Sequence, residues 1–187
     1  MIPIKNKKKT LQATVQEMRN YSLAYIEKYA PSKQQLKTFL LKKYLKNKVK
    51  NINKKNITDL IEVVLEDLEK NMFINDRIYS KSKAKSLINR FSSINKIRNY
   101  IFSKGIKDKY IKDTIEQIKD NNEDQDFFSA IKVCKKKRIG PSRDENNRIL
   151  FYKKDMGVLA RSGFSYETSK KVLNLPKIEF KNYCKLL

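Results

Sequence analysis

The stretch 153–173, which reads KKDMGVLARSGFSYETSKKVL, predicts a helix, a tight stop and a second helix. Gly163 can adopt the positive φ that ends many helices without a steric cost. Phe164 is then the apolar residue of the hinge, and Ser165 can cap the second helix by accepting a hydrogen bond from a free backbone N–H. The apolar positions are Met156, Val158 and Leu159 in the first helix and Val172 and Leu173 in the second.

The same layout occurs earlier in the chain. Segment 97–115, which reads IRNYIFSKGIKDKYIKDTI, has Gly105 at the place of Gly163 and Ile106 at the place of Phe164. Two helix pairs that share a glycine stop and an apolar hinge indicate an internal repeat.

A third and weaker copy lies near the N-terminus. Ser32 and Gln35 have the spacing of a capping box, in which each side chain accepts a hydrogen bond from the other residue's backbone N–H. Tyr44 stands where the other copies have glycine, so the helix is expected to run on before a Lys/Asn-rich insertion at 46–56. That insertion is interpreted as a solvated loop, with a phosphate-contacting loop as the alternative.

The fold class predicted from these copies is all-α, with three tandem three-helix repeats and no sheet. Only 4 Gly and 4 Pro interrupt 187 residues, which favours helices over a many-stranded fold. We expect about nine helices. The expected divisions are a basic flexible arm at 1–12, repeat 1 at 13–73, repeat 2 at 74–122, repeat 3 at 123–175 and a C-terminal tail at 176–187.

The chain carries a large positive charge. Lys and Arg number 43 against 20 Asp and Glu, which gives a formal net charge of +23. Such a surplus indicates a polyanionic environment: nucleic acid, an anionic membrane or an acidic protein. An AT-rich genome, which favours Lys, Asn and Ile, is the alternative source of part of this charge. Acidic residues collect on the predicted third helices, where those of helix 57–71 are expected to pair with nearby lysines.

The densest basic run lies at Lys135–Arg138, in the last turn of a helix that ends before Gly140. Cations there complement the helix dipole by about 0.3–1 kcal/mol each at best. Stability alone does not call for four in a row, so the run favours a binding function.

Residues for common chemistry are missing from the sequence. The chain has no histidine, no Gly-rich phosphate loop and no Gly-x-Ser-x-Gly elbow. Cys134 and Cys184 are far apart in the sequence, which excludes the usual zinc patterns and predicts reduced thiols. Cys134 lies on an apolar helix side and is interpreted as a core residue. We therefore predict that the chain is a binding protein and not an enzyme, and that it holds no cofactor and no metal. The charged start and the lack of a long apolar run predict a cytoplasmic protein.

Five motifs follow one another along the chain: Tyr25–Ala30 (followed by Ser32 and Leu36), Phe73–Tyr79, Lys104–Ile106, Lys136–Pro141 and Leu159–Ser165. Their order and spacing resemble the RecX family of bacterial RecA modulators. The resemblance covers roughly residues 14 to 175. The chain departs from the family pattern at Asn75, where Asp is usual, at Ser80, where Ala is usual, and at Tyr44.

The resemblance implies an elongated, curved helical array that lies in the groove of a RecA filament on single-stranded DNA. There it would act as a monomer, hinder ATP turnover and filament growth, and inhibit strand exchange and the SOS co-protease activity. Direct nucleic-acid contact and no membrane association are expected. The alternative is a basic helical nucleic-acid-binding protein that acts independently of RecA. The residues expected to contact the filament or DNA are Arg90, Lys96, Arg98, Lys135, Lys136, Lys137, Arg138, Lys153, Lys154 and Arg161.

Overall fold

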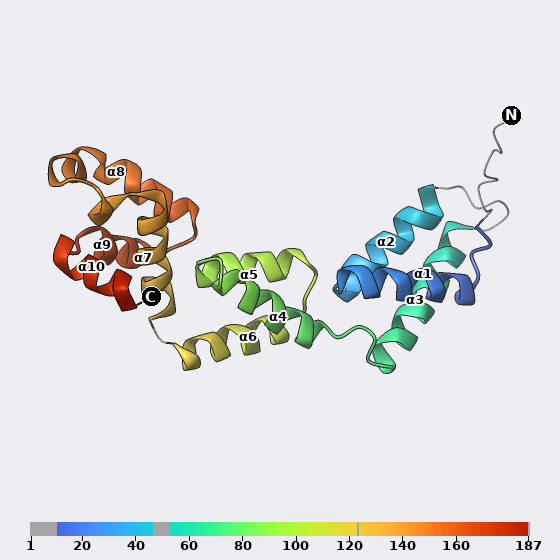
Figure 1. The fold of residues 1–187 in the computed structure, drawn as a ribbon. Coiled ribbons are helices and arrows are strands. Elements are labelled where there is room, and N and C mark those ends of the chain that lie inside the picture. The colour runs from blue at the N-terminus through green and yellow to red at the C-terminus, as the bar shows by residue number, and fades with distance from the viewer. Residues whose placement is uncertain (1–10, 47–52, 123, 187) are drawn as a thin grey trace, which may run out of the picture. The chain divides into compact units, whose positions relative to one another are not determined.

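The structure is a computed structural model that describes residues 11–46, 53–122 and 124–186. Over these residues the secondary structure is helical and contains no strand, which confirms the all-α prediction (Figure 1). The chain divides into two compact units, Met1–Tyr79 and Ser80–Leu187, which we call the N-terminal and C-terminal units.

The N-terminal unit holds the first repeat, in which α1 (Val15–Tyr29), α2 (Lys33–Lys46) and α3 (Lys54–Lys70) pack together. Helix α3 is strongly amphipathic because its apolar residues recur every three or four positions. The centre of the core is fully shielded from solvent and consists of Met18, Leu36, Leu40, Tyr44, Ile61, Val64, Leu65 and Leu68.

The predicted helix signals of this repeat are confirmed. Gln35 accepts from the Ser32 backbone N–H at 3.1 Å, and the Ser32 hydroxyl accepts from the Gln35 N–H at 3.2 Å. Tyr44 lies inside α2, which runs on as expected. Its buried hydroxyl donates to Glu17 at 3.1 Å, and burial together with that carboxylate raises the pKa of Tyr44.

Two predicted basic segments fall partly outside the described residues, namely 1–10 of the arm and 47–52 of the insertion. The ends of the insertion are helical, because Lys46 closes α2 and Lys54 opens α3. Helix α3 thus begins three residues before the predicted start at Ile57, and Asn53 caps it by accepting from a first-turn N–H.

The C-terminal unit contains the second and third repeats. Its helices are α4 (Asp76–Ile88, which begins in the N-terminal unit), α5 (Ile94–Ser103), α6 (Asp108–Asn121), α7 (Gln125–Lys137), the short 3-10 helix η1 (Gly140–Ser142), α8 (Glu145–Arg161), α9 (Tyr166–Leu173) and α10 (Lys177–Leu186). The second repeat is α4–α6 and the third is α7–α9.

About nine helices were expected. The described part of the chain contains ten α-helices, and the tail forms the tenth. Helix α10 packs against α7 and buries Phe180 in the core of the third repeat. The Tyr183 ring also meets the Phe127 ring edge-on, with 5.3 Å between centroids. The tail is therefore part of the folded C-terminal unit.

The two predicted glycine stops are confirmed, with φ of 74° at Gly105 and 88° at Gly163. At Gly163 space is also short, because a Cβ there would lie 2.5 Å from the Ser93 hydroxyl and 3.3 Å from Lys96 Cβ. The Ser93 hydroxyl donates to the Ser162 carbonyl at 3.0 Å. The turn between α8 and α9 thus rests on the first turn of α5.

Two aspartates each bond the first helix of one repeat to the second helix of the repeat before it. Asn75 caps α4 by accepting from two first-turn N–H groups, so the Asp-to-Asn departure keeps the capping oxygen. Asp76, in the first turn of α4, accepts from the Lys33 N–H of α2 at 2.9 Å. Asp126 of α7 accepts in the same way from the Ile94 N–H of α5 at 2.7 Å.

Candidate functional site

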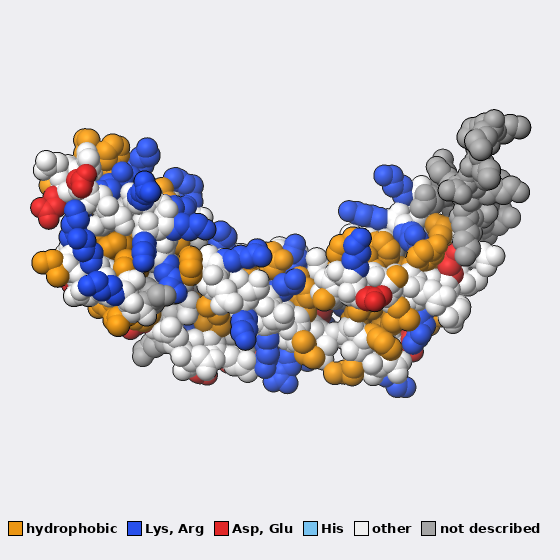
Figure 2. Space-filling view, viewed as in Figure 1, with side chains coloured by type: hydrophobic (Ala, Val, Ile, Leu, Met, Phe, Trp, Pro, Cys, Tyr) orange, Lys and Arg blue, Asp and Glu red, His pale blue; other side chains and the backbone are white. Residues whose placement is uncertain are grey.

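The basic run ends α7 as predicted. Lys135, Lys136 and Lys137 form the last turn, and Arg138 follows in the left-handed conformation with φ of 54°. All four are exposed. Lys135 Nζ donates to the Cys184 carbonyl of α10 at 3.3 Å, whereas the other three form no ion pair with any described residue. The face of the third repeat seen in Figure 2 carries many Lys and Arg side chains and few Asp and Glu.

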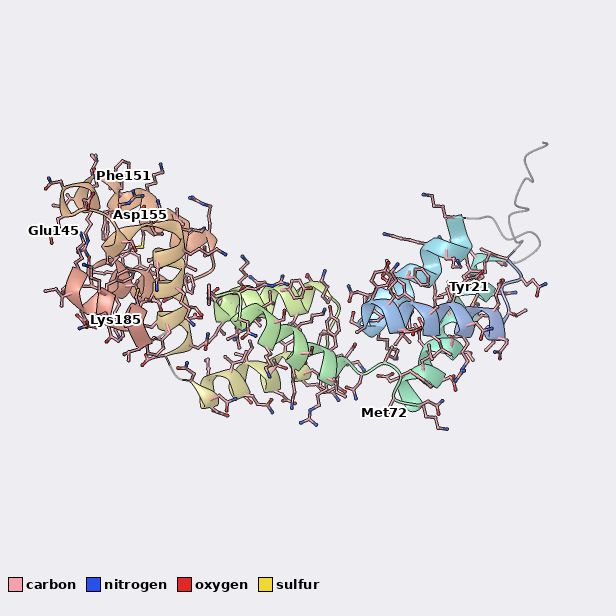
Figure 3. All side chains as sticks on the ribbon, viewed as in Figure 1. Tyr21, Met72, Glu145, Phe151, Asp155 and Lys185 are labelled. Carbon is pink, nitrogen blue, oxygen red and sulfur yellow. The ribbon has the colours of Figure 1, made fainter. Side chains whose placement is uncertain are left out.

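A buried carboxylate fixes the chain directly after the run. Asp155 of α8, which is labelled in Figure 3 and is 1% exposed, accepts from the Gly140 N–H at 2.8 Å and from Arg143 at 2.7 and 2.8 Å. Burial acts to raise the pKa of Asp155, but these hydrogen bonds and the charges of Arg143 and Lys154 hold it below its usual value. A Cβ at Gly140 would lie 2.4 Å from the tip of the Leu173 side chain, and the φ of 53° is one that other residues rarely adopt, so this position favours glycine.

Helix α8 carries three further predicted contact residues, Lys153, Lys154 and Arg161, and all are exposed. Lys154 Nζ lies 5.6 Å from the centroid of the Phe151 ring. Arg161 folds back along its own helix and is the residue that a Cβ at Gly157 would meet, at 3.3 Å. The guanidinium of Arg161 thus covers the helix surface at Gly157.

The second repeat contributes Arg90, which follows α4, and Lys96 and Arg98 on α5. All three are exposed. Lys96 lies beside the turn that follows Arg161, because that turn rests on α5. Lys96 and Arg98 are two positions apart on a helix and therefore point in different directions. The ten predicted residues thus all lie in the C-terminal unit and are all exposed, but Lys96 and Arg98 do not face the same way.

Two residues beside the run were missed from the sequence. Phe91 and Lys132 line a cavity of about 440 Å³ together with Lys135 and Lys136. Lys132 could have been found, because it lies three and four positions before those lysines on one side of a helix. Phe91 belongs to the turn between α4 and α5, and no local pattern connects it to α7.

The acidic residues of α3 pair with cations as predicted. Lys33 and Glu69 are 2.5 Å apart, Lys37 pairs with Glu62, and Arg19 Nε lies 2.9 Å from Asp67. The prediction that acidic residues collect on third helices is wrong for the third repeat. Its third helix, α9, carries one acid, Glu167, and two lysines, Lys170 and Lys171. The short α9 therefore adds to the positive charge of that repeat.

The cysteines are free, and Cys134 is buried in the core as predicted. Burial, together with Asp155 and Cys184, raises the pKa of the Cys134 thiol to about 12, which removes it as a nucleophile. Over the described ranges, no three His, Cys, Asp or Glu residues are grouped so that they could hold a metal ion. None of the described helices is long and apolar enough to span a membrane.

The fold and site together define an all-helical repeat protein with an exposed basic surface. No protein-family model matches the sequence. The chain is 29% identical over 164 residues to the regulatory protein RecX of Myxococcus xanthus, with 84% of each chain covered.

Two solved structures share the fold. One is the crystal structure of RecX from Lactobacillus salivarius, with a TM-score of 0.62, 17% identity, and 85% of this chain and 94% of that chain covered. The other is a crystal structure of regulatory protein RecX, with a TM-score of 0.61, 18% identity, and coverage of 86% and 74%. The RecX resemblance predicted from the sequence is confirmed.

Proposed function

We propose that this chain binds RecA filaments on single-stranded DNA and slows RecA ATP hydrolysis, strand exchange and co-protease activity. The observation that carries the proposal is the exposed cationic run Lys135–Arg138 in a chain that resembles RecX regulatory proteins. A filament on DNA is a polyanion, and an exposed cation without an ion-pair partner gains most from such a surface.

The mechanism is steric and electrostatic, with no chemistry by this chain. Asp155 holds Gly140 and Arg143, so the backbone that follows the run has a fixed course. The helix end therefore presents its cations from a rigid base, which limits the conformational entropy lost on binding. A bound protein that spans neighbouring subunits would oppose the subunit movements and additions that a growing filament requires.

The test is RecA ATPase activity on single-stranded DNA, measured with the wild type and with Lys136→Glu/Lys137→Glu. This variant spares Lys135, which bonds to α10, and Arg138, which ends the helix. The control is Lys109→Glu/Lys112→Glu, which makes the same charge change at two exposed residues of α6. We expect inhibition to be lost in the first variant and largely kept in the control.

The alternative function, a nucleic-acid binder that acts without RecA, gives a different dose response. We expect the wild type to inhibit at amounts well below those that coat the DNA. Inhibition only when bare DNA is saturated would favour the alternative. Direct DNA binding should weaken with salt, with log K falling by about 0.7 per phosphate neutralised on a single strand. Binding that does not depend on salt would contradict both functions.

A further inference from the structure

The cavity beside the basic run has an unusual lining. Its walls come from the α4–α5 turn, from α7 and from α10, and it has a volume of about 440 Å³. The lining consists of Phe91, Ile131, Lys132, Lys135, Lys136 and Cys184. Three ammonium groups thus border a floor of aromatic and aliphatic carbon, and no carboxylate is among the lining residues.

The aromatic wall suits a planar group. Lys132 Nζ lies 5.0 Å from the centroid of the Phe91 ring, so a positive charge and an aromatic face border the same space. Phe91 is only half-buried, and Ile131 beneath it is fully buried. A nucleobase can pack its face against such a wall and keep its polar edge in water.

The lysines suit a phosphate. Lys135 is held by one hydrogen bond to the Cys184 carbonyl, and its ammonium has two further donors. Lys132 and Lys136 are one helical turn apart on the same side of α7. An acidic peptide would also meet these cations, but its backbone N–H groups need acceptors, and this lining is poor in them.

We propose that this cavity binds one nucleotide of single-stranded DNA, with the base against Phe91 and the flanking phosphates on Lys132, Lys135 and Lys136. This proposal rests on the proposed function, from which it takes single-stranded DNA as the partner. It adds that one nucleotide of that DNA lies in the cavity beside the basic run.

Cys184 supplies a direct readout, because it lines the cavity and is half-buried, whereas Cys134 is buried in the core. The rate of alkylation by neutral iodoacetamide is measured on each thiol by peptide mass spectrometry. Alkaline pH is used, because burial raises the pKa of the Cys184 thiol. The probes are a thymidine oligonucleotide, an abasic oligonucleotide of equal length, and polyglutamate. We expect the thymidine oligonucleotide to slow Cys184 alkylation most, the abasic one less, and polyglutamate least.

Three variants separate the base from the phosphates. Phe91→Leu should weaken thymidine-oligonucleotide binding about fivefold or more and leave abasic binding unchanged, because it removes only stacking. Lys132→Gln should lower the slope of log K against log salt by about 0.7 for both oligonucleotides. Lys112→Gln, an exposed lysine on α6 that does not line this cavity and is not among the predicted contact residues, is the control for a general loss of charge.

Unchanged Cys184 alkylation under saturating thymidine oligonucleotide would overturn the proposal, and so would stronger protection by polyglutamate, which would indicate an acidic peptide as the occupant. These assays contain no RecA. Protection of Cys184 without any effect on RecA ATPase would therefore contradict the proposed function alone, and ATPase inhibition without protection would contradict only the cavity proposal.

Discussion

The first and third repeats are both rich in lysine, yet their cations have different surroundings. In the first repeat Arg19, Lys33 and Lys37 each pair with a carboxylate of α3. In the third repeat the run Lys135–Arg138 forms no ion pair within the described chain, and the carboxylate of Asp155 is used by Arg143. These three cations of the first repeat are therefore neutralised by carboxylates of the same repeat.

Both repeats also place cations over aromatic rings, so ring contacts do not distinguish them. Lys43 Nζ lies 3.6 Å from the Tyr21 ring centroid, and Lys28 Nζ lies 5.3 Å from that of Tyr29. The labelled Tyr21 is on α1 in Figure 3. In the third repeat Lys154 Nζ lies 5.6 Å from the Phe151 ring centroid, and Lys171 Nζ lies 4.6 Å from that of Phe127. The difference between the repeats lies in the ion pairs, so net charge overstates the binding capacity of the first repeat.

The largest effect is expected from Leu159→Asp, which breaks the third repeat without changing any of its cations. Leu159 is 0% exposed, so the variant buries an unpaired charge and should lose about 4 kcal/mol or more of unfolding free energy in that repeat. Hydrogen exchange should then show α7–α9 unprotected and α1–α3 still protected. The matched control is Ala160→Asp, at an exposed neighbouring position. Equal protection of α7–α9 in both variants would contradict this account of the core.

A smaller effect is expected from Asp155→Asn, which removes the charge that holds Gly140 and Arg143. Hydrogen bonds to a charged group contribute about 1.5–3 kcal/mol, so the third repeat should lose roughly 2 kcal/mol at neutral pH. The pKa of Asp155 is lowered by folding. Its contribution is therefore present above the unfolded pKa of about 3.9 and is lost as pH falls through the lower folded value. Denaturation followed from pH 6 to pH 2 should show that loss in the wild type and not in the variant.

Asp126 gives the control of opposite sign for this pH series. Burial raises the pKa of Asp126, although the Ile94 N–H and Lys119 act to lower it. Its contribution is greatest at low pH and falls as pH rises through the unfolded value and then the folded one. Asp126→Asn keeps an oxygen acceptor for the Ile94 N–H and removes this contribution, which in the wild type increases as pH falls. The unfolding free energy of the variant should therefore decrease more steeply with acid than that of the wild type. A shallower loss would contradict the assigned sign.

Local signals could be predicted from the sequence, and contacts between repeats could not. The capping box at Ser32 and the glycine stop at Gly163 depend on neighbours within a few residues, so spacing is enough to find them. The bonds of Asp76 to α2 and of Asp126 to α5 join residues distant in the sequence, so local spacing does not predict them. Phe91 was missed for the same reason. The ten proposed contact residues are all exposed, but exposure does not select among them.

The smallest change to stability, and the sharpest test of the comparison, is Glu62→Gln/Glu69→Gln in the first repeat. These carboxylates are 39% and 45% exposed and pair with Lys37 and Lys33, so losing both pairs should cost less than about 1 kcal/mol each. If pairing is what withholds those lysines from DNA, the variant should bind a thymidine oligonucleotide more tightly. Its slope of log K against log salt should then increase in magnitude by up to about 0.7 for each lysine released.

The control is Glu116→Gln/Asp120→Asn on α6, which makes the same charge change at two exposed acids that form no ion pair with a described residue. Equal gains in the two variants would mean that net charge alone sets the affinity, and the distinction between paired and unpaired lysines would fail. A gain confined to the first variant would locate a latent binding surface on α2, kept weak by the acids of α3.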